Sequence, residues 1–252
     1  HANHMPGHNY TKLGMWHEAA ISMDSATRVE LAYMNERLAL PFETWNFAHN
    51  RDYLCYIQEQ LGMEQAARLG ARTMMDAPRN PQPENEEGYE TFMFGLNAFV
   101  RGLVKFERWD TILAKDSIPW RDEPTDQSAK AWVETLAYAG LGKAVDARAR
   151  FDEFKASLTA LEEKDPDAKK HAQPDVDLAE GLVAAAEGNI LEAARLLGAA
   201  AEAERAAREA NEYANDPPSR AWPVHRLLGD VYLAHGELRL AVAAYELALK
   251  VE

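Results

Sequence analysis

The sequence contains a single cysteine, Cys55, among 252 residues. An internal disulfide is therefore impossible, but both reducing and oxidising compartments stay open because helical proteins do not need disulfides. The chain also lacks any run of about 18 apolar residues, which excludes a transmembrane helix at the level of the sequence. We therefore expect a soluble chain without membrane insertion, in either the cytoplasm or the periplasm.

Basic residues are outnumbered, with 27 Lys and Arg against 41 Asp and Glu, and the formal net charge is −14. An acidic surface repels nucleic acid and anionic membranes, so we expect no nucleic-acid partner. The chain also has no Gly-rich phosphate loop, no Gly-x-Ser-x-Gly elbow and no His-Glu-x-x-His motif. These absences argue against the common nucleotide enzymes and hydrolases. They leave no residue to assign as catalytic and favour a non-enzymatic role.

Self-similarity at a fixed spacing is the most informative pattern present. Five segments contain a glycine followed by an alanine five residues later, and three of them carry a second glycine seven residues before the first. The pairs are Gly14–Ala19, Gly62–Ala67, Gly142–Ala147, Gly188–Ala193 and Gly236–Ala241, and the preceding glycines are Gly7, Gly181 and Gly229. The first glycine of each pair can adopt a positive φ and end a helix, and the small residues let two helices approach closely.

This pattern predicts an all-α protein built from about six antiparallel helix hairpins. We place them at residues 1–40, 46–78, 88–117, 127–163, 175–212 and 219–252. Stacked hairpins of this kind form an α-solenoid with a right-handed superhelix, here a single domain that we take to be a fragment of a longer array. In the third hairpin Glu107 stands where the turn glycine should be. No segment alternates with period two, so we expect no sheet.

Proline and polar residues predict the connections between hairpins, at residues 80–85, 118–125, 164–174 and 216–223, because they break helices and favour turns. Asp175 or Asp177 is then expected to cap the first helix of the fifth hairpin. The alanine-rich stretch 193–210 favours a long helix. Cys55 falls on the first helix of the second hairpin and is expected to be a small core residue.

The last hairpin resembles tetratricopeptide (TPR) repeats, since the positions typical of that family are occupied by Leu228, Gly229, Tyr232, Gly236, Ala241, Tyr245 and Ala248. The first hairpin resembles a narrower group of bacterial TPR proteins with a His-x-x-His-Met-Pro-x-His signature, here residues 1–8, followed by Tyr10 and Gly14. His49-Asn50 and residues 213–229 fit the same group, although His225 separates Val224 from Arg226. The resemblance covers the whole chain. It implies a solenoid whose concave face binds a peptide or a partner protein, which is an analogy from fold alone.

Five of the eight histidines lie within the first fifty residues. Pro6 fits best in a first helical turn, so His4 should lie just before a helix and His8 on its first turn. His49 opens the next hairpin and faces His8 if the first helices of the two hairpins line one surface. Three or four imidazoles converging there would suit zinc, copper or nickel. This interpretation makes His1, His4, His8 and His49 metal ligands, in a metallochaperone or as part of a larger metalloenzyme.

Two other interpretations stay open beside the metal site. Histidines at a helix start also bond to backbone or carboxylates, so the cluster can be a structural polar network. If the chain is instead a scaffold, Tyr10, Tyr53 and Trp222 are the candidate partner-binding residues. The partner would be a basic or neutral protein or peptide, or the remaining parts of a longer chain, and the sequence leaves its identity open.

Overall fold

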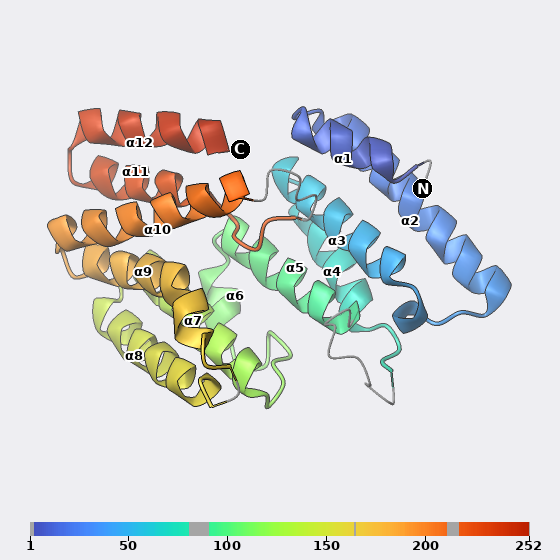
Figure 1. Cartoon of the computed structure of the whole chain (residues 1–252), viewed down its shortest axis with the longest axis horizontal. Coiled ribbons are helices and arrows are strands. Elements are labelled where there is room, and N and C mark those ends of the chain that lie inside the picture. Colours follow the sequence, from blue (N-terminus) through green and yellow to red (C-terminus); the bar gives the residue numbers. More distant parts are fainter. Residues whose placement is uncertain (1–2, 81–90, 164, 211–216, 252) are drawn as a thin grey trace. The chain divides into compact units, whose positions relative to one another are not determined.

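The helices follow the pairing that the glycine spacing predicts. A computed structural model describes residues 3–80, 91–163, 165–210 and 217–251, and every regular element in these ranges is helical (Figure 1). The elements are α1 (Met5–Lys12), α2 (Trp16–Arg37), the short 3-10 helix η1 (Pro41–Glu43), α3 (Trp45–Gln60), α4 (Glu64–Met75), α5 (Thr91–Lys105), α6 (Trp109–Leu113), α7 (Pro124–Gly140), α8 (Ala144–Leu161), α9 (Ala168–Ala186), α10 (Ile190–Ala210), α11 (Val224–Ala234) and α12 (Leu238–Val251). The all-α prediction is confirmed for the described residues. None of the helices in them is both long and apolar enough to cross a membrane.

The turn between the two helices of a hairpin depends on a left-handed backbone at one residue. All five predicted turn glycines have positive φ, namely Gly14 (68°), Gly62 (72°), Gly142 (69°), Gly188 (81°) and Gly236 (78°). In the third hairpin Glu107 takes the same conformation with a φ of 54°. A side chain at positive φ is uncommon because Cβ crowds the backbone, so Glu107 occupies the turn position at a conformational cost.

The small residues of the pattern lie where helices approach most closely. Ala19 on α2 is fully buried, and a Cβ added to Gly7 on α1 would lie 2.8 Å from Cε of Met23 on α2. In the last hairpin a Cβ on Gly229 would lie 2.5 Å from the ring of Tyr245. These glycines therefore let α1 pack directly against α2 and α11 against α12.

Backbone contacts divide the chain into two compact units. The first comprises His1–Phe106 and Asn215–Ser219, and the second Glu107–Ala214 and Arg220–Glu252. In the first unit α3 contacts α2, α4 and α5, and α1 packs on α2. In the second unit α7 contacts both α8 and α9, and α9, α10 and α11 each contact the next helix along the chain. The single right-handed solenoid stays a prediction.

The start of the fifth hairpin was predicted wrongly. We expected residues 164–174 to be a connection and Asp175 or Asp177 to cap the helix, but α9 begins at Ala168 and carries Pro174 inside it. Asp175 lies in the helix interior, where its carboxylate accepts a hydrogen bond of 2.7 Å from Arg220. The helix-forming residues before Pro174 outweigh the backbone hydrogen bond that proline removes. The predicted connection at 80–85 falls, apart from Asn80, outside the described residues.

Substitution of two glycines that lie inside helices, Gly95 and Gly198, tests how closely neighbouring helices approach. A Cβ on Gly95 of α5 would lie 2.7 Å from the carbonyl oxygen of Ala71 and 2.8 Å from the backbone nitrogen of Met75 on α4, and a backbone cannot yield as a side chain does. We expect Gly95→Ala to destabilise the protein by about 1–3 kcal/mol. Gly198→Ala on α10, where nothing lies within 4 Å, should stabilise it by about 0.5–1 kcal/mol. Urea unfolding followed by circular dichroism measures both, and equal effects at the two positions would contradict the packing.

Candidate metal centre

Helix α1 presents two histidines to the same side of the first unit. His4 is the residue preceding the helix, Pro6 lies in the first turn and His8 follows one turn after His4, as the sequence predicts. Residues four apart lie above one another on a helix face. The close contact between Gly7 and Met23 fixes α1 on α2, so the backbone that carries both imidazoles is held by packing.

Helix α3 supplies the third histidine from the centre of the first unit. Ten of its side chains are buried, among them His49, Asn50 and Tyr53. Tyr53 belongs to a hydrophobic cluster that also contains Ala19 and Met23 of α2, and Tyr10 of α1 packs against the same cluster. This apolar cluster brings α1, α2 and α3 together directly beneath the histidines.

His4, His8 and His49 converge. Their ligand nitrogens all lie within 4.8 Å of one another, and Nε2 of His8 lies 2.8 Å from Nε2 of His4. The centroid of the His49 ring is 5.1 Å from that of His4 and 5.5 Å from that of His8. His8 and His49 are buried, with 4% and 6% of their surface exposed, whereas His4 is half-buried. His1, the fourth predicted ligand, lies outside the described residues.

The hydrogen bonds of His4 determine which nitrogen can bind a cation. Its Nδ1 lies 2.6 Å from Oδ1 of the buried Asn50 and donates to it, so the neutral ring carries its lone pair on Nε2. That lone pair faces Nε2 of His8, and one proton lies between the two nitrogens. A second proton there would make His4 a cation and leave two N–H groups facing each other. A neutral His4 with its lone pair on Nε2 is in the protonation state that metal ligation needs.

The spacing of the nitrogens suits a metal ion after small side-chain movements. With bonds of 2.0–2.1 Å to a tetrahedral zinc ion, two histidine nitrogens are about 3.3 Å apart. The His4–His8 separation of 2.8 Å is shorter, and the other pairs extend to no more than 4.8 Å. Asn50 holds the ring of His4 from the side opposite to the ligand nitrogen. Such outer partners fix the orientation of histidine ligands in metal sites.

Aromatic rings pack on the cluster from below and from the side. The ring of Tyr53 makes edge contacts with His8 at a centroid distance of 4.4 Å and with His49 at 5.4 Å, and Trp45 lies 4.8 Å from His49. These rings exclude water from one side of the histidines. The low dielectric there strengthens interactions with a bound cation.

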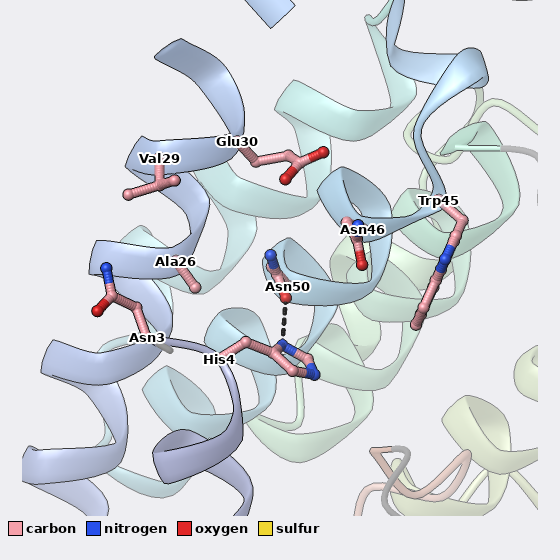
Figure 2. A pocket seen from close by; sticks show the side chains of 8 residues that line it. All are labelled: Asn3, His4, Ala26, Val29, Glu30, Trp45, Asn46 and Asn50. Atoms are coloured by element: carbon pink, nitrogen blue, oxygen red, sulfur yellow. Dashed lines mark hydrogen bonds between the residues drawn. The ribbon is translucent and has the colours of Figure 1, made fainter. Parts of the chain in front are cut away.

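A pocket of about 380 Å³ adjoins the cluster at His4. It lies between α2 and α3, and Figure 2 shows the Glu30 carboxylate and the His4 ring on opposite sides of Asn50. Its lining residues are Asn3, His4, Ala26, Val29, Glu30, Trp45, Asn46 and Asn50. Sequence reasoning did not identify Glu30 or Asn50 as part of a site. The only available signal was the position of Asn50 directly after His49.

The remaining predicted residues take other places. Tyr53 is only 4% exposed, and Tyr10 is half-buried against the same core, so both contribute mainly to packing. In the second unit Trp222 contacts the ring of Trp109 and lies under the guanidinium of Arg226.

Cys55 is fully buried, which confirms it as a core residue, and burial raises the pKa of its thiol to about 12. A thiol that stays protonated is not a metal ligand.

The burial of His4 gives the metal-free protein a defined pH dependence. Desolvation lowers the pKa of His4 below the ordinary value of 6.5, and the hydrogen bond to Asn50 opposes this only in part. The unfolded chain therefore binds this proton more readily than the folded chain. The stability that His4 contributes is complete above the unfolded pKa and is lost as the pH falls through 6.5 towards the folded pKa.

We expect the unfolding free energy of the metal-free protein to fall between pH 7.5 and pH 5, and to fall less in His4→Gln, which cannot be protonated. Denaturant unfolding at several pH values in the presence of a chelator measures the difference. Identical pH profiles for the wild type and the variant would contradict the assignment.

Comparisons with known proteins identify no relative of this chain. No protein-family model matches it, and neither a curated protein nor a solved structure does so. The relation to TPR proteins, and to the group with the histidine signature, therefore stays a prediction.

Proposed function

We propose that this chain binds a transition-metal ion, zinc, copper or nickel, through His4, His8 and His49. The observation that carries the proposal is the convergence of three imidazole nitrogens within 4.8 Å, contributed by α3 and by the start of α1. The ligands come from residues that are 41 positions apart between His8 and His49, so local sequence alone does not bring them together. The packing of α1 and α3 on α2 brings these ligands together.

The chemistry of the ligand set selects the class of ion. Three imidazoles without a thiolate or a carboxylate suit zinc, copper and nickel and are poor ligands for magnesium or calcium, which prefer oxygen. Structural zinc sites use four protein ligands, whereas sites with three keep a position for water or another molecule. His4, His8 and His49 are three ligands, so they leave such a position. This is the arrangement of a metal site that acts on or carries something, rather than one that only stabilises a fold.

A scaffold function has weaker support. It rests on the helical-hairpin architecture, and one architecture hosts many functions. Two of the residues expected to contact a partner, Tyr10 and Tyr53, pack against the core cluster of the first unit. Peptide binding on a concave face therefore stays a prediction without a site of its own, and the metal site is the function that the geometry supports best.

Metal binding is tested by titrating the metal-free protein with zinc or cobalt under competition by a chromophoric chelator. We expect one ion per chain in the first unit, and a loss of affinity of at least about 100-fold when any one of His4, His8 and His49 becomes alanine. His17→Ala is the matched control, because His17 is exposed on α2 and belongs to no such cluster within the part of the chain that the structure describes. A stoichiometry near zero, or equal affinity in all four variants, would sink the proposal.

The contact between Asn50 and His4 makes a finer prediction. Asn50→Ala removes the acceptor that holds Nδ1 of His4, so we expect the metal affinity to fall by about 10–100-fold while one ion still binds. Asn46→Ala, an exposed residue on the same helix, should leave the affinity unchanged. If both variants bind metal as the wild type does, Asn50 does not orient the ligand.

A further inference from the structure

The pocket between α2 and α3 is separate from the metal centre. Of the three histidines only His4 lines it, and the pocket meets the ring of His4 on the side where Nδ1 bonds to Asn50 (Figure 2). The ligand nitrogen Nε2 faces His8 instead. An ion held by the three histidines therefore does not face the pocket, and a molecule in the pocket is recognised by the other residues of its lining.

The pocket carries one negative charge, on Glu30 of α2. Glu30 is half-buried, and Figure 2 shows its carboxylate directed from α2 towards α3. In the part of the chain that the structure describes, no lysine or arginine lines the pocket or forms an ion pair with Glu30. A partly desolvated carboxylate attracts a cation more strongly than a carboxylate in bulk water does. Glu30 is therefore a binding group for a cation from outside the chain.

Two amides provide further polar groups beside Glu30. Oδ1 of Asn50 accepts the hydrogen bond from His4, which leaves Nδ2 as a donor, and Figure 2 shows Nδ2 on the side of Glu30. Asn46 lies one turn earlier on α3 and also lines the pocket. An amide oxygen is a neutral acceptor, so a cation with several N–H groups can bond to it and to the carboxylate together.

The walls favour an organic cation over a metal ion. Calcium takes about six to eight oxygen ligands, whereas the pocket has a single carboxylate. Val29 adds aliphatic surface from α2, and the half-exposed ring of Trp45 lines the pocket from the start of α3. Aromatic faces attract ammonium and guanidinium groups. The volume of about 380 Å³ is at the small end of ligand pockets and suits a short aliphatic chain.

We infer that this pocket binds a small organic cation, an ammonium or guanidinium group on a short aliphatic chain, through Glu30. The cationic group pairs with the Glu30 carboxylate and donates to the amide oxygen of Asn46. The aliphatic chain lies against Val29 and the ring of Trp45. The inference goes beyond the metal site and does not depend on it, because the carboxylate and the walls are in place without an ion. The cation is either a free amine or guanidine, or a lysine or arginine side chain of another protein.

The test is a calorimetric titration of the full chain in the presence of a chelator, so that no metal contributes. The probes are n-butylammonium and n-butylguanidinium, with N-butylurea as a neutral analogue and butanoate as the anion. We expect at least one cation to bind about tenfold more tightly than butylurea and butanoate, because hydrogen bonds to charged groups are the stronger ones. Glu30→Gln should abolish this preference. Glu36→Gln, an exposed site on the same helix with the same change of charge, should retain it.

Two blocked amino acids, N-acetyl-lysine amide and N-acetyl-arginine amide, identify the source of the cation. Binding as tight as that of the free cations indicates a side chain of a partner protein, and much weaker binding indicates a free small molecule. Both results support the cation site.

Three results would overturn the inference. They are equal binding of the cations and butylurea, no detectable binding of either cation at about 10 mM, and a preference that survives in a folded Glu30→Gln variant. None of them bears on the histidines, because metal uptake is measured separately, without the organic cations.

Discussion

Helix α3 carries four polar side chains that the fold buries, and this constraint organises the first unit. His49, Asn50, Asp52 and Glu59 are each less than 10% exposed. A buried polar group without a partner costs free energy, so each must be matched from a neighbouring helix. Asp52 and Glu59 both bond to the buried Arg101 of α5, at 2.9 Å each. Asn50 bonds to His4, and the ring of His49 packs against those of His4 and His8.

Two faces of α3 thus have different roles. The ion pairs with Arg101 are complete within the chain, and both carboxylates and the guanidinium are shielded from water. They fix α3 against α5. The histidine face is different, because three imidazoles meet there, two of them joined by a hydrogen bond, and a pocket adjoins one of them. A metal ion would use the lone pair that Nε2 of His4 directs at Nε2 of His8 in the metal-free cluster. The ion pairs of Asp52 and Glu59 with Arg101 therefore hold α3 in place, and α3 in turn holds His49 in position. A binding site needs such support from a rigid element.

Much of the fold follows from local rules. The turn glycines and the alanines five residues later are dictated by backbone sterics and helix contact, and both are visible in the sequence. The start of α9 was not predictable in this way, since Pro174 breaks helices in most contexts. The placement of His4 just before α1 and of His8 on its first turn followed from Pro6. The approach of His49 was a hypothesis about neighbouring hairpins, and the pocket was missed because Glu30 and Trp45 become neighbours only through tertiary packing. Residue types in the sequence can suggest a set of metal ligands. The tertiary packing of the helices determines which other residues lie beside those ligands.

The most direct measurement is X-ray absorption spectroscopy at the metal edge of the purified protein loaded with one equivalent of zinc. The account predicts a first shell of three imidazole nitrogens at about 2.0–2.1 Å and one further light atom, with the outer-shell scattering typical of histidine rings. A shell made only of oxygen atoms, or with fewer than two imidazoles, would contradict the assignment of His4, His8 and His49 as the ligands.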